Sequence, residues 1–66
     1  MTREEAEEAP LGLYLIFWES GGMSKALITQ NESGTRIIKC HNWTANSYCA
    51  PFADYVEDIE KIVFVM

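Results

Sequence analysis

The sequence predicts a small α+β protein with a four-stranded, mostly antiparallel sheet in the order β-β-β-α-β and one short helix packed on one face. Three observations predict this fold. Apolar and β-branched residues alternate in successive segments that glycine-containing turns separate. A segment with helical spacing follows Pro51, and the chain closes on another β-branched run. Its 66 residues correspond to one small domain.

Residues 1–10 are expected to form an acidic tail in front of a single domain at 11–66. They contain four glutamates and one arginine. Thr2 and Glu5 match a capping box, which would begin a short helix that Pro10 ends. Because such a short helix is unstable alone in water, we expect a frayed tail. The alternative is a negatively charged arm that contacts a partner.

The longest apolar run, residues 11–19, is expected to be the central strand. It is rich in aromatic and branched residues, and Gly21 and Gly22 follow it as a hairpin turn. A two-residue turn at these glycines would place Phe17 opposite Ala26 on the second strand. Side chains along a strand alternate between the two faces of the sheet, so this register decides which residues the helix covers.

The second strand is expected at residues 23–30, and the third from residue 35 to residue 41 or 42. A turn that ends at Gly34 would pair Ile28 with Ile38. Alternation then divides the sheet into a helix-covered face and an opposite face. The covered face carries Leu13, Leu15, Phe17, Ala26, Ile28, Ile38 and Cys40, and the opposite face carries Tyr14, Ile16, Trp18, Lys25, Leu27, Ile37, Lys39 and His41.

Residues 42–50 are expected to form the longest loop. Pro51 suits the first position of a helix, and apolar residues then recur at helical spacing. Residues 61–66 form the last strand, which we expect to lie parallel to the first. The apolar helix positions are Phe52, Tyr55, Val56 and Ile59.

The composition indicates the class of partner. A net charge of -5 predicts repulsion from nucleic-acid phosphates and from anionic membranes. We therefore expect a protein partner with a basic surface, and no direct binding to nucleic acid or membrane. The acidic N-terminal segment lacks the basic start of a signal peptide, so we expect a cytoplasmic protein in which Cys40 and Cys49 are free thiols.

No residue set predicts catalysis, a metal or a cofactor. Cys40, Cys49 and His41 lack the fourth ligand that a structural zinc site requires. Cys40 and His41 also point to opposite faces of a strand, so they cannot act as a nucleophile and its base. The glycine pair lies between two strands rather than before a helix, which excludes a phosphate-binding loop. We expect a protein without enzymatic activity.

An uncovered apolar sheet face is the first candidate binding surface. Large exposed apolar patches mark contact surfaces, and Tyr and Trp are enriched at binding hot spots. The alternative is that the loop carrying Trp43 and Tyr48 folds back over this face. The candidate contact residues are Tyr14, Ile16, Trp18 and Leu27, with Ile37 beside them.

An acidic helix face is the second candidate binding surface. Asp54, Glu57 and Asp58 are the leading contact residues and Glu60 is the next. Carboxylates one turn apart repel each other, and a cationic partner would relieve this repulsion. The glutamates of residues 1–10 should matter less, because ordering a tail costs entropy. The alternative is ordinary solubilising charge.

These features together predict an inhibitor that docks on a basic, nucleic-acid-binding surface of another protein. In size, acidity and single compact sheet, the chain resembles the small phage-encoded inhibitors of host nucleic-acid enzymes, anti-CRISPR proteins among them. Some of those inhibitors mimic DNA by presenting carboxylates where phosphates would lie. The resemblance is one of format without a shared motif, so it implies no residue roles.

Two other functions stay open from the sequence. The first is a homodimeric structural or accessory module that buries the face of Tyr14, Ile16, Trp18 and Leu27 against its own copy. The second is a surface that stacks single-stranded nucleic acid, which the net charge of -5 disfavours. The residues in favour of stacking are Trp18, Tyr14, Lys25, Lys39 and His41.

Overall fold

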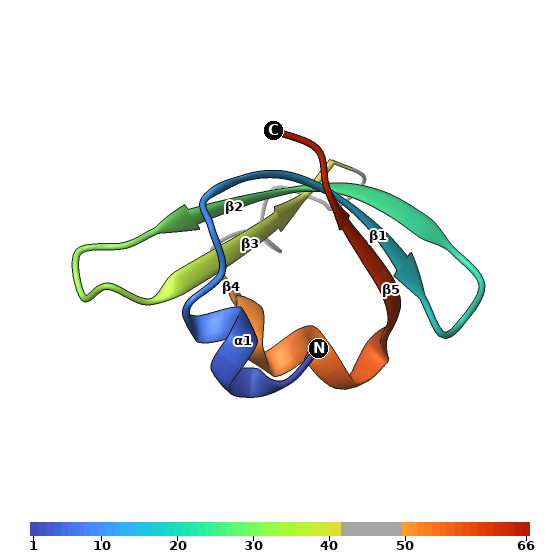
Figure 1. The fold of residues 1–66 in the computed structure, drawn as a ribbon, viewed down its shortest axis with the longest axis horizontal. Helices are drawn as coiled ribbons and strands as arrows, with labels where there is room; N and C mark the ends of the chain where they lie inside the picture. Colours follow the sequence, from blue (N-terminus) through green and yellow to red (C-terminus); the bar gives the residue numbers. More distant parts are fainter. Residues whose placement is uncertain (42–49) are drawn as a thin grey trace.

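The computed structural model describes residues 1–41 and 50–66, which form one sheet and two short helices. The strands lie in the order β4-β3-β2-β1-β5, and every neighbouring pair is antiparallel. The sheet arches over the two helices, which lie together on one side of it (Figure 1). The elements are α1 (Arg3–Glu7), β1 (Gly12–Trp18), β2 (Met23–Gln30), β3 (Arg36–Cys40), β4 (Ala50–Pro51), the 3-10 helix η2 (Phe52–Asp58) and β5 (Ile59–Phe64).

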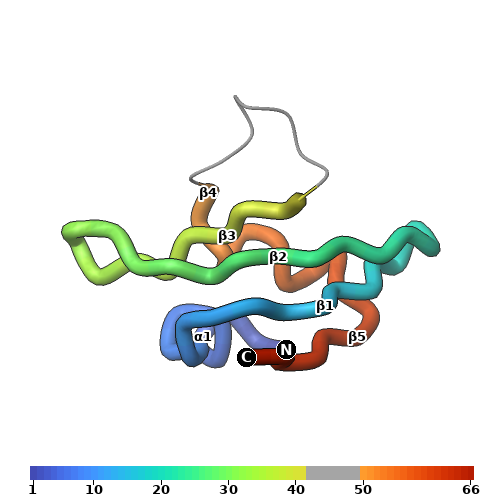
Figure 2. The backbone as a smooth tube through the Cα atoms, turned by 90° about the horizontal axis from the view of Figure 1, so that it is seen from above, coloured from blue at the N-terminus to red at the C-terminus, as the bar shows by residue number. Residues whose placement is uncertain are grey.

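The predicted α+β class with an antiparallel sheet is confirmed, whereas the details of the topology are corrected. The described residues contain five strands rather than four, and α1 is a helix in addition to the expected one. β5 is antiparallel to β1, not parallel. The strand β4 pairs antiparallel with β3 just before η2. It has only two residues, too few to show the alternation that identifies a strand in the sequence. Figure 2 shows the strands lying side by side across the molecule.

The register between β2 and β3 is as predicted, because Ile28 lies opposite Ile38. The register between β1 and β2 is not, because Phe17 lies opposite Met23 instead of Ala26. The reason is a longer turn. The backbone N–H of Trp18 donates to the carbonyl of Gly22 at 2.8 Å, and Gly21 takes the positive φ of 98° inside a three-residue loop.

This shift of three residues exchanges the two faces of β1. An odd shift moves every side chain of a strand to the other face of the sheet. Tyr14, Ile16 and Trp18 therefore face the helices, and Leu13, Leu15 and Phe17 face away from them. The predicted division of the sheet is correct for β2 and β3 and wrong for β1.

The core lies between the sheet and the helices. The Tyr14 hydroxyl donates a 2.6 Å hydrogen bond to the carbonyl of Pro10, so this buried ring keeps a polar partner. Cys40 is a buried free thiol opposite Ala26, as expected, whereas Cys49 lies outside the described residues. The largest fully buried side chains are Phe52, Ile16, Ile28, Ile38 and Cys40.

Residues 1–10 pack on the domain rather than forming the expected frayed tail. Both hydrogen bonds of the capping box at Thr2 are present, and Ala6 and Ala9 are part of the core. The Arg36 Nε donates to the carbonyl of Ala9 at 2.7 Å. These tertiary contacts supply the stability that a short helix lacks alone.

Candidate functional site

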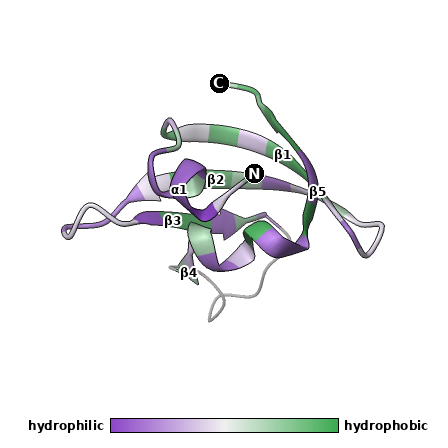
Figure 3. Cartoon of the chain, turned by 60° about the horizontal axis from the view of Figure 1, so that its bottom comes forward, coloured by the Kyte–Doolittle hydropathy of each residue, from purple (hydrophilic) through white to green (hydrophobic). Residues whose placement is uncertain are grey.

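The packing of α1 on η2 brings together two acidic segments that are far apart in the sequence. The Arg3 Nη1 donates to the carbonyl of Ala53 at 3.1 Å and so joins the two helices. Figure 3 brings this side of the molecule forward, with much of α1 in the purple of hydrophilic residues. We call the exposed carboxylates of the two helices, together with that of the α1 C-cap residue Glu8, the acidic layer: Glu4, Glu5, Glu7, Glu8, Asp54, Glu57 and Asp58.

Two carboxylates of the acidic layer have partners within the chain. Asp54 forms a 3.3 Å salt bridge with Arg3, in which both side chains are 56% exposed, so it contributes little to stability. The Thr2 backbone N–H donates to Glu5 Oε1 at 2.7 Å. Backbone and side-chain hydrogen bonds from Thr2 lower the pKa of Glu5. Both contacts fix carboxylates in place on the surface.

The predicted acidic site residues are all exposed, but they do not form one row. η2 is a 3-10 helix, in which residues three apart lie above each other. Asp54 and Glu57 therefore share one line, while Asp58 shares a line with Tyr55. Glu60 lies on β5 and lines a separate shallow hollow beside the β1–β2 turn.

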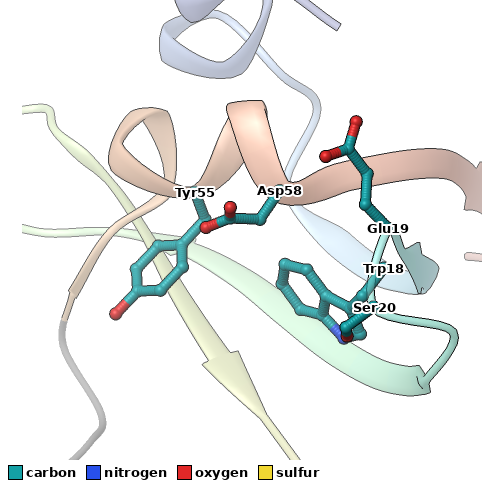
Figure 4. Close-up of a pocket in the computed structure, with 5 residues that line it drawn as sticks. All are labelled: Trp18, Glu19, Ser20, Tyr55 and Asp58. Atoms are coloured by element: carbon teal, nitrogen blue, oxygen red, sulfur yellow. The ribbon is translucent and has the colours of Figure 1, made fainter.

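Asp58 belongs to a small cavity of about 310 Å³ between η2 and the β1–β2 turn. Figure 4 shows Asp58 and Tyr55 extending from η2 on one side and Trp18 from the end of β1 on the other. The rings of Trp18 and Tyr55 contact each other edge to face, with their centres 6.4 Å apart. The lining residues are Trp18, Glu19, Ser20, Tyr55 and Asp58.

Two hydrogen bonds hold the walls of this cavity. Trp18 Nε1 donates to Ser24 Oγ at 2.9 Å, which orients the indole ring. The backbone N–H of Glu19 donates to the carbonyl of Asp58 at 2.9 Å, which ties the turn to η2. Aromatic rings flanked by carboxylates suit the side chain of a lysine or an arginine. Trp18 and Asp58 were both predicted as contact residues, but on two separate surfaces.

The predicted apolar contact face does not exist as one surface. Tyr14 is 3% exposed and Ile16 is fully buried, and both contribute to the core. Leu27 is 45% exposed on the opposite face of the sheet. The three-residue turn explains the difference, because it turns β1 over relative to β2. Tyr14, Ile16, Trp18 and Leu27 therefore do not form one surface that a homodimer could share. The loop predicted at residues 42–50 as an alternative cover lies outside the described residues except for Ala50, which is in β4.

The outer face of the sheet was predicted from the sequence, but with the wrong residues of β1: Leu13, Leu15 and Phe17 lie on it instead of Tyr14, Ile16 and Trp18. The signal for the correct residues was the Glu19-Ser20-Gly21 segment, which fits a three-residue loop with glycine in the left-handed position. Lys61 Nζ lies 5.9 Å from the centre of the Phe17 ring. Glu60 lies at the bulge beside Lys61. The residues that the register places on this face are Leu13, Leu15, Phe17, Met23, Lys25, Leu27, Thr29, Ile37, Lys39, Lys61 and Val63.

Other kinds of site find no support in residues 1–41 and 50–66. These residues contain no group of three side chains that could hold a metal ion, and no helix long and apolar enough to cross a membrane. Burial raises the pKa of the Cys40 thiol to about 11, which makes it a poor nucleophile. Comparisons with protein-family models, curated proteins and solved structures give no match to this chain.

Proposed function

We propose that this protein is a small, non-enzymatic binding protein that docks on a basic surface of a partner protein and blocks it. The observation that carries the proposal is the acidic layer, which α1 and η2 build from the two ends of the chain. A protein surface that binds nucleic acid is positively charged and so complements the acidic layer. We therefore expect this protein to inhibit a nucleic-acid-binding protein by covering that surface.

The charges of the molecule are separated in a way that favours docking through the helices. The carboxylates of the acidic layer lie on one side of the sheet, and Lys25, Lys39 and Lys61 lie on its outer face. Physiological salt screens exposed charges over about 10 Å, so carboxylates closer together than this act on a partner as one combined negative charge. Such a field accelerates association with a cationic surface and weakens with ionic strength.

The fold changes which carboxylates should matter. The glutamates of residues 1–10 are expected to be minor if they form a tail, because binding would have to order them. α1 is already ordered by its contacts with η2, so this entropy cost is absent. We therefore expect Glu7 on α1 to contribute to binding as Glu57 on η2 does.

The cavity beside Trp18 adds a contact of defined chemistry to this surface. A lysine or arginine side chain of the partner would lie against the rings of Trp18 and Tyr55, with its charge close to Glu19 and Asp58. A cation over an aromatic ring contributes about 0.5–2 kcal/mol, more when water is excluded. The acidic layer would thus increase the association rate and orient the partner, and the cavity would bind one basic side chain of the partner.

The test compares two variants that change the net charge equally. Proteins are captured from a lysate on the immobilised chain at low salt, and the association rate of the captured partner is then measured. Glu7→Gln with Glu57→Gln should slow association about tenfold at low salt and much less at high salt. The matched control, Glu32→Lys, also raises the net charge by two, but it lies in the β2–β3 turn and should change the rate little. Equal rates for the parent and the double variant would contradict the proposal.

A further inference from the structure

We propose that β5 is a docking edge at which two copies of this chain pair their β5 strands antiparallel. The two sheets would then join into one sheet across a two-fold axis. This inference does not depend on the proposed function, because it uses the edge of the sheet rather than the acidic layer. The partner it names is a second copy of the chain.

The two edges of the sheet differ in how open they are. Among the described residues, β4 forms one edge and β5 forms the other. β4 has only two residues, and one of them is Pro51, which has no backbone N–H to donate. β5 has six residues without proline. The bulge opposite Trp18 and the charges of Glu60 and Lys61 protect the first half of β5. The second half, residues 62–64, has no such protection, and an apolar edge of this kind is a template for pairing with another chain.

The register on β1 shows which backbone groups of β5 face the open edge. Val65 donates its N–H to the carbonyl of Leu13 at 2.8 Å, and Leu13 donates to the carbonyl of Met66 at 2.6 Å. In an antiparallel pair, every second residue directs both its N–H and its C=O to the same neighbour. Val63, opposite Leu15, therefore directs its backbone N–H and C=O to β1. Ile62 and Phe64 direct their backbone groups to the free edge.

The side chains along the second half of this edge are apolar and accessible. Val63 is 38% exposed and Phe64 is 51% exposed, although both are large apolar residues in a strand. A hollow of about 460 Å³ lies on the helix side of the edge, between α1 and β5. An added strand would cover it. The hollow is lined by Met1, Glu5, Glu8, Ala9, Pro10, Tyr14, Ile62 and Phe64.

A second copy of β5 is complementary to this edge. With the two-fold axis at Val63, Ile62 of each copy lies opposite Phe64 of the other. Pairs of an aromatic and a β-branched residue are among the favourable cross-strand pairs. This register uses both outward-facing residues of each copy. β5 also carries one glutamate and one lysine, Glu60 and Lys61, so the strand does not repel itself although the chain is acidic.

The geometry predicts an unusual dependence on salt. Directly opposed residues of an antiparallel pair lie on the same face, so the acidic layers of both copies would lie on the same side of the joined sheet. Each copy has a net charge of -5, and the two layers repel each other. Salt screens this repulsion, so the dimer should become tighter as ionic strength rises. Docking on a basic partner should respond in the opposite direction.

The experiment measures mass by sedimentation equilibrium over a range of concentrations at low and high salt. The parent chain should form a dimer that high salt tightens. Val63→Lys and Val63→Glu each place like charges opposite each other at the axis, and each should weaken the dimer on the order of tenfold or more. A mixture of the two variants should restore a dimer. Val63 points to the outer face rather than to the core, so both variants should keep the monomer fold.

Two further measurements distinguish edge pairing from other contacts. Leu27→Lys adds the same charge to the same face on β2, and this control should dimerise as the parent does. Amide exchange at Ile62 and Phe64 should slow in the parent as concentration rises, but not in Val63→Lys. A parent chain that stays monomeric at its highest soluble concentration would overturn the proposal. A dimer that Leu27→Lys breaks and Val63→Lys preserves would also overturn it, in favour of contact through the sheet face.

Discussion

Cys40 shows how a residue with reactive chemistry becomes a packing residue. It lies on β3 opposite Ala26, and both are buried beneath the helices. Burial raises the pKa of its thiol to about 11, because the thiolate cannot be solvated there. Its role in this fold is to fill space in the core.

This burial predicts a loss of stability in alkaline solution. In the unfolded chain the thiol ionises near its ordinary pKa of 9.0, whereas in the folded chain it stays protonated up to about pH 11. The contribution of Cys40 to stability is therefore complete below pH 9 and is lost as the pH rises toward 11. Urea unfolding of a Cys49→Ser variant should show this loss, and it should be smaller in Cys40→Ala with Cys49→Ser. The comparison is needed because burial also raises the pKa of Tyr14. Equal pH dependence in the two variants would contradict the prediction.

Gly12 is the residue at which the start of β1 meets the end of the chain. Its φ of 148° disfavours any side chain, and an added Cβ would collide with the Met66 carbonyl oxygen and lie 2.9 Å from Phe64 Cε1. Gly12→Ala should lower the free energy of unfolding by about 1–3 kcal/mol, measured by urea titration. The control is Gly22→Ala, where the nearest atom is 3.8 Å away and φ is ordinary. A Gly12→Ala variant as stable as Gly22→Ala would show that the chain end moves away freely.

At the scale of elements, α1 gains its stability from its neighbours. The helix has five residues, too few to persist alone. Arg3 bonds to η2 and Arg36 bonds to the carbonyl of Ala9, just after α1. The same contacts place the glutamates of α1 next to the carboxylates of η2, so one packing event both stabilises the helix and completes the acidic layer.

If α1 is part of the cooperative fold, its cap should contribute to global stability. The Thr2 Oγ1 accepts a 3.1 Å hydrogen bond from the backbone N–H of Glu5. Thr2→Ala should lower the free energy of unfolding by about 1 kcal/mol, whereas Thr2→Ser keeps the acceptor and should change it little. Chemical denaturation followed by Trp fluorescence measures both variants. No difference between them would mean that α1 unfolds separately from the sheet.

At the scale of the whole molecule, the charge is divided between two sides. The helices carry the acidic layer, and the outer face of the sheet carries three lysines among apolar side chains. The open β5 edge lies between these two surfaces and has no net charge of its own. Docking on a basic partner and pairing of two copies therefore use different surfaces, and ionic strength changes their affinities in opposite directions.

Local pattern was sufficient for much of this fold. Alternation identified β1, β2 and β3, and helical spacing after Pro51 located η2. The β2–β3 register followed correctly from the turn at Gly34. These features depend on residues close together in the chain, where turn chemistry and burial pattern agree. The exposure of Asp54 and Glu57 was predictable for the same reason.

Only the tertiary structure decided the faces of β1, the position of residues 1–10 and the direction of β5. A three-residue turn in place of a two-residue one exchanges the two faces of β1, a strand that is apolar on both, so alternation could not select between them. The stability of α1 comes from contacts with residues far along the chain, such as Ala53 and Arg36. The acidic layer and the cavity at Trp18 depend on those same long-range contacts, and a pattern along the chain does not contain them.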